Sequence, residues 1–266
     1  MVQAAELHTR GTRGKPEQAS KAMEYATDAY KFGALLCGLH GVGRLAGLSD
    51  IAAHVVPQAV AFLILAVLGV DAWRSMYEDV GTTPGVYAPA HENGIRCCIL
   101  QIPFQLYELA CAARVKRLRG KTFEMVAHHA LALLLACLAV NKDIYYFYGT
   151  YFFGVSELSS LPLVFLDLFK MFPDVKKRYP VSNELIRPFF CVCFLVLRTV
   201  YWPYVSYHFW SASLTHYPSD TLEVVTFCTV NLLLSALQAF WTYLIIIGLY
   251  KLAIGDPGTH EVDKID

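Results

Sequence analysis

The chain has 266 residues, of which 56% are hydrophobic and 17% charged, and its formal net charge is zero. An average soluble domain has roughly 25% charged residues, so this composition is typical of an integral membrane protein. A net charge of zero excludes the basic surplus with which many proteins bind nucleic acid. We therefore expect membrane lipids as partners, other membrane proteins as a further alternative, and no nucleic acid.

The N-terminal segment, 1–29, is polar and lacks the apolar core and cleavage site of a secretory signal peptide. Arg10, Arg13 and Lys15 would suit a mitochondrial presequence, but the acidic residues of the segment argue against one. We expect this segment to be mobile.

Six segments have the roughly 20 mostly apolar residues that a helix needs to cross a bilayer. They lie near 52–70, 94–113, 123–140, 143–168, 187–210 and 222–250. A weaker, glycine-rich stretch, 30–48, fits either a seventh span or an amphipathic helix on the membrane surface. We predict an all-α, polytopic membrane bundle or barrel of six transmembrane helices, with one domain over 30–252 and an acidic tail over 253–266.

Basic residues orient these spans, because cytosolic loops collect Lys and Arg. The loops after the second and fourth spans are basic, whereas 211–221 contains no Lys or Arg. We therefore place both basic loops, the segment before the first span and the tail in the cytosol. The basic residues are Arg114, Lys116, Arg117, Arg119 and Lys121 in the first loop, Lys170, Lys176, Lys177, Arg178 and Arg187 in the second, and Arg10, Arg13, Lys15, Lys21, Lys31 and Arg44 before the first span.

Several spans carry polar residues that are costly in hydrocarbon. A charged group there costs on the order of 3 kcal/mol even on the mildest scale, so Glu157 and Arg198 should face inward and either pair or share a wet cavity. Each residue alone is compatible with a structural role, but together they favour a polar chamber in the cytosolic half of the bundle. The group comprises His54, Glu108, His128, His129, Glu157, Arg198, Asn231 and Gln238.

The adjacent histidines His128 and His129 cannot both face the bundle centre, because neighbouring residues on a helix diverge by about 100°. One can enter the cavity while the other bridges to a neighbouring helix. Glu124 precedes His128 by four residues on the same helical face, so it is a candidate to orient that ring.

The sequence lacks the motifs that are typical of several other classes of enzyme. The chain has no His-Glu-x-x-His zinc motif, no clustered His-x-x-His boxes, no Gly-x-Ser-x-Gly elbow and no glycine-rich phosphate loop. We expect no metal site and no bound cofactor.

Six stretches occur in an order and spacing that resemble the TLC domain family, over roughly residues 45–252. They are "LSDIAAHVV", "PFQLYELACA", "FEMVAHHALALLL", "YFFGVSELSSLPLVF", "FLVLRTVYWPY" and "NLLLSALQAFWTYLI". The family consists of multi-span proteins that include the ceramide synthases and several small lipid-linked members.

A resemblance to ceramide synthases implies acyl-CoA-dependent N-acylation of a long-chain base by the paired histidines, inside a helical barrel open to the cytosol. This chain departs from that pattern, because it reads "GVSELSS" where a ceramide synthase has a further His-Asp pair and another Asp. It is more similar to the small members, which are described as influencing membrane lipid composition or trafficking. Family resemblance implies the endoplasmic reticulum or another endomembrane, with a mitochondrial or other organelle membrane as the alternative.

Two functional hypotheses follow for a protein of lipid metabolism or lipid homeostasis. The first is an acyl or other lipid-group transferase, with acyl-CoA as a possible co-substrate and His128, His129 and Glu157 as catalytic residues. The second is a non-catalytic lipid-binding scaffold or accessory subunit of a larger membrane complex. The candidate lipid-binding or substrate-binding residues are His54, Glu108, Glu124, Arg198, Asn231 and Gln238.

Overall fold

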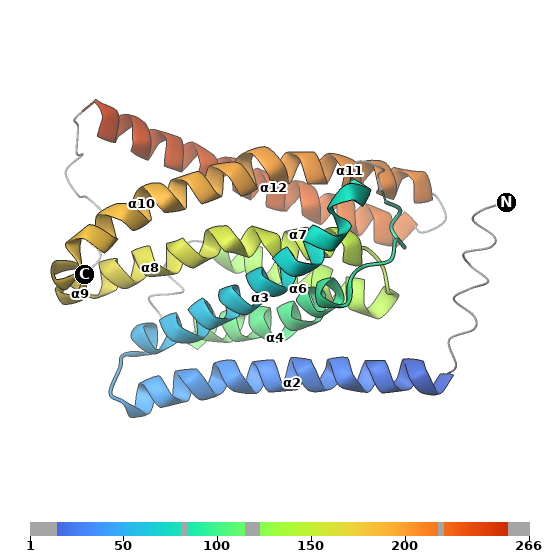
Figure 1. Ribbon diagram of the computed structural model, residues 1–266, viewed down its shortest axis with the longest axis horizontal. Coiled ribbons are helices and arrows are strands. Elements are labelled where there is room, and N and C mark those ends of the chain that lie inside the picture. The colour runs from blue at the N-terminus through green and yellow to red at the C-terminus, as the bar shows by residue number, and fades with distance from the viewer. Residues whose placement is uncertain (1–14, 81–83, 115–122, 218–220, 255–266) are drawn as a thin grey trace.

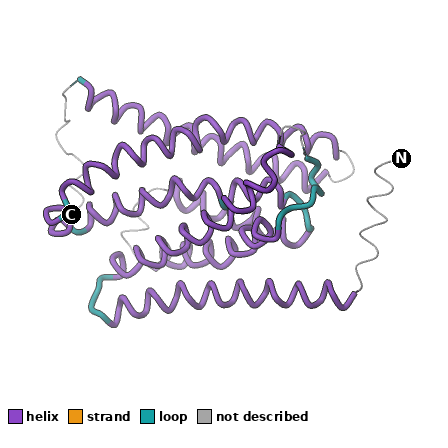
Figure 2. The backbone as a smooth tube through the Cα atoms, viewed as in Figure 1, coloured by secondary structure: helices purple, strands orange, loops and turns teal. Residues whose placement is uncertain are grey.

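The computed structural model of the chain describes residues 15–80, 84–114, 123–217 and 221–254. Every regular element in these ranges is a helix (Figure 2). Most of the first predicted basic loop and nearly all of the acidic tail lie outside the described residues, so their positions stay predictions.

The described helices are, in chain order, α2 (Lys15–Leu45), α3 (Asp50–Val80), α4 (Glu92–Arg114), α6 (Phe123–Lys142), α7 (Tyr146–Phe153), the 3-10 helix η1 (Val155–Ser159), α8 (Ser160–Met171), α9 (Pro173–Arg178), α10 (Pro180–Phe194), the π-helix η2 (Leu195–Tyr201), α11 (Trp202–His216) and α12 (Thr221–Ala253). Most of them lie side by side along the long axis of the molecule (Figure 1). α2 forms one edge of the bundle in this view, and α12 lies with the rod of α10, η2 and α11 at the other. The short helix α9, with Lys176, Lys177 and Arg178, marks one end, which we call the α9 end and which the predicted orientation places toward the cytosol.

Two apolar clusters hold the bundle together. One joins α2, α3, α4 and α8 through residues such as Phe32, Leu65 and Phe104. The larger one joins α6, α7, η1, α11 and α12 to parts of α3 and α4, and it is rich in aromatic rings, including Tyr148 and Phe209. The second cluster surrounds the cavity described below.

Five of the described helical segments are long and apolar enough to cross a membrane, which confirms a polytopic helical membrane protein. They are Asp50–Met76, Phe123–Lys142, Tyr146–Met171, Pro180–His216 and Thr221–Lys251. α4 is not among them, because polar residues interrupt its apolar sequence. Its 23 residues span about 34 Å, enough for a crossing, and it packs against α2, α3, α6 and α7. The sixth crossing at α4 stays our prediction.

The weak N-terminal stretch belongs to α2, which runs lengthwise along α4. Near the start of α4, Arg96 forms ion pairs with Glu24 at 2.6 Å and Asp28 at 3.2 Å. Toward the other end, the hydroxyl of Tyr107 lies 2.9 Å from Nδ1 of His40. This lengthwise packing is the arrangement that a seventh span would have, but α2 is not among the described helices that are long and apolar enough to cross a membrane, so both alternatives for 30–48 stay predictions.

This packing bears on the predicted placement of the N-terminal basic residues. Lys21 and Lys31 lie toward the end opposite α9, because their neighbours Glu24 and Asp28 pair with Arg96 there. Arg44 lies at the other end of α2, so a membrane-crossing α2 would put these lysines and Arg44 on opposite sides, and the cytosolic placement of the whole segment stays a prediction. The helix begins at Lys15 and crosses the boundary that the composition suggested at residue 30.

The fourth predicted span is broken in its middle, where α7 gives way to η1 at Gly154. The backbone of Gly154 packs directly on α3 at Gly69: a Cβ added to Gly69 would lie 2.5 Å from two backbone atoms of Gly154. Glycine at both positions lets the two segments approach this closely. The break places the carbonyls and side chains of η1 inside the bundle.

Gly69→Ala should lower the free energy of unfolding by about 1–3 kcal/mol, toward the upper end, because the added methyl group meets backbone that cannot rotate away. Gly248→Ala on α12 is the matched control, since a Cβ there meets nothing within 4 Å. Denaturation of the purified protein in detergent micelles, followed by circular dichroism, measures both changes. Equal stability of the two variants would show that α3 and η1 are not in this contact.

Candidate functional site

One face of α4 supplies a row of buried polar side chains. Gln101, Gln105 and Glu108 are spaced by four and three residues, so they lie on the same face of the helix. All three are buried. α4 must turn this polar face toward other polar groups, because a buried polar atom without a hydrogen-bond partner destabilises the fold.

Toward the α9 end, Glu108 lies between two histidines from different helices. His54 of α3 donates from Nε2 to Oε1 of Glu108 at 3.0 Å, and Nε2 of His129 on α6 lies 3.8 Å from Oε2. Tyr107 stacks on the His54 ring, with centroids 5.5 Å apart. Each oxygen of the carboxylate therefore faces one imidazole.

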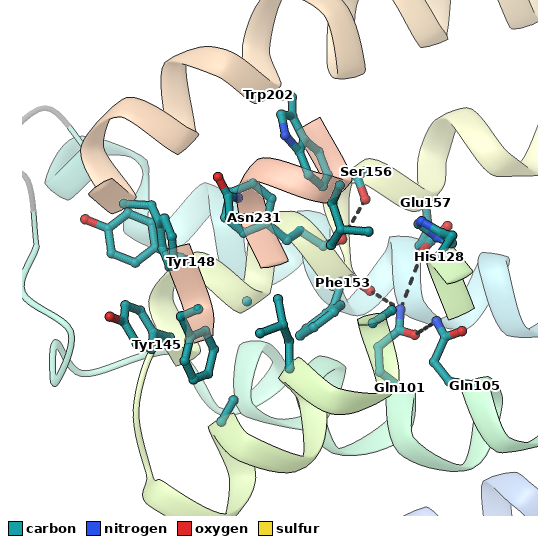
Figure 3. Close-up of a pocket in the computed structure, with 18 of the residues that line it drawn as sticks. Gln101, Gln105, His128, Tyr145, Tyr148, Phe153, Ser156, Glu157, Trp202 and Asn231 are labelled. Carbon is teal, nitrogen blue, oxygen red and sulfur yellow. Dashed lines mark hydrogen bonds between the residues drawn. The ribbon is translucent and has the colours of Figure 1, made fainter. Parts of the chain in front are cut away.

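Two glutamines continue this network toward the middle of the bundle. Nδ1 of His129 donates to Oε1 of Gln105 at 2.6 Å, and Nε2 of Gln105 donates to Oε1 of Gln101 at 2.6 Å. Nε2 of Gln101 then donates to the Phe153 carbonyl at 3.0 Å and to Oε1 of Glu157 at 3.4 Å (Figure 3). The amide of Phe153–Gly154 at the break in the fourth span is thus tied to α4.

Arg198 ends the network in a cradle formed by the "GVSELSS" segment. Its Nε donates to Oγ of Ser159 at 2.7 Å, and its Nη2 donates to the Ser156 carbonyl at 3.1 Å and to Oγ of Ser160 at 3.0 Å. Oε2 of Glu157 lies 3.6 Å from the same nitrogen. The predicted pairing of Glu157 with Arg198 is therefore present, and the serines satisfy most of the guanidinium.

The helix that carries Arg198 is locally a π-helix. π-helical turns are rare in proteins, and those that do occur are often found at functional sites. η2 precedes Pro203, which has no backbone N–H to donate to the preceding turn. The Tyr151 hydroxyl donates to the Leu197 carbonyl, which satisfies one backbone group of the irregular turn.

The network is continuous from His54 to Arg198, across α3, α4, α6, η1 and η2. Every charged or ionisable member contacts an opposite charge or a hydrogen-bonding partner. This compensation explains how five helical segments can hold such groups inside an apolar bundle.

A narrow cavity of about 40 Å³ lies beside the network. Its polar end is formed by His128, Glu157 and Arg198, and its other end by aromatic rings that include Tyr145 and Tyr148 (Figure 3). A water molecule needs roughly 10–15 Å³ of such space, so the cavity has room for a few water molecules and not for a lipid chain in this conformation.

His128 is the one member of the pair that lines this cavity. Its Nδ1 is buried and has no hydrogen-bond partner among the described residues. The ring packs edge-on against His129 and Trp241, with centroids 5.4 and 5.6 Å away. The structure thus shows the expected division, with His128 at the cavity and His129 bonded to a neighbouring helix.

The remaining predicted residues fall into three different situations. Asn231 lines the cavity and accepts a hydrogen bond from Nε1 of Trp210 at 2.9 Å. Gln238 is buried, and neither atom of its amide has a partner in the described part of the chain. No hydrogen bond joins Glu124 to His128 within that part, so the structure gives no support to an orienting role for Glu124.

The sequence reasoning missed Gln101 and Gln105, which connect the two halves of the network, and the serines at 156 and 160. The spacing of Gln101, Gln105 and Glu108 on one face of an apolar helix was a usable signal. The serines lie together in the quoted "GVSELSS", but serines are common in helical spans and their spacing did not identify Arg198 as their partner. Among the described residues, no three His, Cys, Asp or Glu side chains are grouped in a way that could hold a metal ion.

These features define a polytopic helical membrane protein with a hydrogen-bonded polar interior. Residues 54–247, more than two thirds of the chain, match the TLC domain. The chain therefore belongs to the TLC domain family, as its motifs predicted. Searches of curated proteins and of solved structures gave no match.

Proposed function

We propose that this membrane protein is a lipid acyltransferase, in which His128 moves the proton of the acceptor lipid at the polar end of the cavity. The observation that carries the proposal is the buried Nδ1 of His128, which lacks a partner while the other ionisable groups of the network are bonded. A buried nitrogen that is not engaged by the protein remains able to act as a general base toward a substrate hydroxyl or amine.

The same geometry divides the roles of the two histidines. His129 bonds Gln105 and lies beside Glu108, so we assign it a positioning role. Arg198 is engaged by three oxygens of the serine segment and by Glu157. It therefore steadies Glu157 and the cavity wall in this proposal, and we do not assign it to an anionic headgroup.

The donor in this proposal is acyl-CoA, approaching from the α9 end. The acceptor oxygen or nitrogen bonds to the acyl carbon as the thioester C–S bond breaks, and CoA leaves as the thiol with the proton that His128 took from the acceptor. An acyl chain is wider than the described cavity, so the aromatic side chains that line it must move when substrate binds. Family membership supports a lipid substrate and an endomembrane, with the endoplasmic reticulum as the first compartment to test.

The experiment is an acyl-transfer assay with purified protein, radiolabelled acyl-CoA, and a panel of amine, alcohol and lysolipid acceptors. His128→Ala should lower turnover at least about 100-fold, the lower bound for a general base. His216→Ala is the control, because His216 contacts Tyr87 at the other end of the bundle. Both variants should retain the melting temperature of the wild-type protein to within a few degrees, so that loss of fold is not mistaken for loss of catalysis.

A second function, a non-catalytic lipid-binding scaffold, is favoured by one observation. In the segment "GVSELSS", where the chain departs from the ceramide synthase pattern, the hydroxyls of Ser159 and Ser160 accept hydrogen bonds from Arg198. If the wild-type protein transfers no acyl group, or if His128→Ala turns over equally fast, the acyltransferase proposal is wrong. A stoichiometric protein partner retained in native mass spectrometry would then support the scaffold.

A further inference from the structure

Asn231 is a polar side chain among the aromatic rings of the cavity. The residue is 3% exposed, and it lines the cavity. The two tyrosine hydroxyls near it are bonded to other parts of the protein: Tyr145 donates to Oγ of Ser213 at 3.0 Å, and Tyr148 donates to the Pro84 carbonyl at 2.7 Å. These tyrosines therefore offer the cavity their apolar ring surfaces, and the amide of Asn231 interrupts that surface.

The orientation of the Asn231 amide is set by Trp210. Nε1 of Trp210 can only donate, so the amide atom that it bonds at 2.9 Å is the oxygen Oδ1. Nδ2, which carries two N–H groups, has no hydrogen-bond partner among the described residues. It is not sealed within the protein, and because its residue lines the cavity, it reaches the cavity space. The bond to Trp210 thus holds a free donor toward the cavity.

Asn231 lies far from the polar end of the cavity. Trp241, which packs against His128, follows Asn231 by ten residues, or about 15 Å along α12. Figure 3 shows the same separation, with His128 beside Glu157 and Asn231 closer to Tyr148. Two atoms of the lining therefore lack partners in the described part of the chain, Nδ1 of His128 at the polar end and Nδ2 of Asn231 toward the aromatic end.

These two atoms call for different groups on a ligand. In the proposed function His128 takes the proton of a hydroxyl or an amine, whereas Nδ2 of Asn231 can only donate and needs an acceptor oxygen. The wall between them includes the apolar side chains of Ala132 and Leu135, which suit a hydrocarbon chain.

The oxygen at Asn231 must be uncharged. The charged residues of the lining are Glu157 and Arg198, which lie at the polar end and pair with each other. A charged group at Asn231 would have no counter-charge beside it, and burying an unpaired charge is far more costly than burying a hydroxyl or a carbonyl.

We infer that the acceptor lipid has two polar groups: a hydroxyl or amine that reaches His128, and an uncharged oxygen about 15 Å along its chain that accepts a hydrogen bond from Nδ2 of Asn231. Asn231 selects this lipid over one with a plain hydrocarbon chain. The inference rests on the proposed function in assigning the end at His128 as the reacting end. The aromatic rings move to admit the chain, as that function requires, while the bond to Trp210 keeps the Asn231 donor in place.

The test measures binding and needs no turnover. Wild-type protein in phosphatidylcholine nanodiscs is irradiated with a dodecanediol that has a hydroxyl at each end and a diazirine at mid-chain, and labelled peptides are identified by mass spectrometry. Dodecanol with the same diazirine, which lacks the distal oxygen, is the control probe. Labelling is normalised to that of α10, which is mostly exposed, because the two probes enter the bilayer to different extents. We expect the diol to label the cavity-lining peptides of α6 and α11 about twofold to tenfold more strongly than the alcohol, the value of one neutral hydrogen bond.

Three variants make the outcome decisive. Asn231→Leu should remove the preference for the diol, because leucine is of similar size and has no donor. Thr229→Val, a polar-to-apolar change on the exposed face of the same helix, should keep the preference. Asn231→Leu leaves Nε1 of Trp210 without its acceptor, so the double variant Asn231→Leu/Trp210→Phe, which removes both partners of the bond, is measured beside it and should also lack the preference.

Two results would overturn the inference. One is equal labelling of the lining peptides by the two probes in the wild-type protein, which is expected if only water occupies the space beside Asn231. The other is a preference for the diol that persists in Asn231→Leu or in the double variant.

Failure of the inference is distinguishable from failure of the proposed function. A preference for the diol that depends on Asn231, without any acyl transfer, contradicts the acyltransferase and leaves the binding site in place. Transfer that requires His128, together with binding that ignores Asn231, contradicts the binding site and leaves the acyltransferase.

Discussion

Arg198→Leu should lower the free energy of unfolding by about 3–5 kcal/mol, the cost of removing one partner from a buried ion pair. The substitution leaves the Glu157 carboxylate in the bundle interior without its counter-charge, so that the Gln101 amide and the Ser160 hydroxyl are the side-chain donors that it keeps among the described residues. It also removes three donors, so the Ser156 carbonyl and the hydroxyls of Ser159 and Ser160 lose their contacts with the guanidinium. Titration with a denaturing detergent, followed by tryptophan fluorescence, measures the change.

The double variant Arg198→Leu/Glu157→Gln separates charge from packing. A neutral glutamine at 157 no longer needs a counter-charge, so the double variant should recover part of the stability that Arg198→Leu loses. Arg187→Leu is the matched control, because Arg187 is exposed on α10 and should change stability by less than about 0.5 kcal/mol. If the double variant is no more stable than Arg198→Leu, the loss arises from the packing of η2 and not from the unpaired carboxylate.

The long apolar helices could be predicted from the sequence because burial in lipid imposes one simple requirement, a run of about 20 apolar residues. The spans expected near 52–70 and 222–250 correspond to apolar stretches within α3 and α12. The break at Gly154 could not be predicted in this way. It depends on the close approach of Gly69, a contact between residues far apart in the sequence.

The charged part of the polar interior could also be predicted, because a charge in hydrocarbon must face inward. His54, Glu108, His129, Glu157 and Arg198 indeed lie in one network. Its neutral members gave a weaker signal, since an amide or hydroxyl costs less to bury and can face several partners. Hydropathy alone therefore locates the ends of the network but not the glutamines that join them.

The ambiguity of 30–48 has a similar physical origin. The first half of α2 is too polar to be read as a span, and only the tertiary pairing of Glu24 and Asp28 with Arg96 shows how these charges are accommodated. The apolar second half packs its Phe32 and Leu36 against the bundle. An apolar stretch of this length is compatible with both arrangements until its partner helix is known.

Glu108→Leu should lower the free energy of unfolding by about 3 kcal/mol and, under the proposed function, should also reduce acyl transfer. The substitution removes the acceptor of the 3.0 Å bond from His54 and the carboxylate beside His129, so two buried imidazoles lose a partner at once. His129 is adjacent to His128, and its displacement would move the proposed base. Detergent titration and the acyl-transfer assay measure the two effects separately.

Glu108→Gln separates the effect of the charge of the carboxylate from the effect of its shape, because glutamine has nearly the same shape and no charge. Glutamine can still accept a hydrogen bond from His54 but carries no charge, so it should cost less stability than leucine. Glu223→Gln is the matched acidic control, since Glu223 pairs with Lys142 near the other end of the bundle in a partly exposed surface ion pair worth about 0–1 kcal/mol. Because Gln105 and Gln101 join the two ends of the network, Glu108→Gln and Arg198→Leu should be non-additive if these bonds transmit strain. Simple additivity of the two losses would show that the His54–Glu108–His129 cluster and the Arg198 cradle are energetically independent, and that the glutamines only fill the space between them.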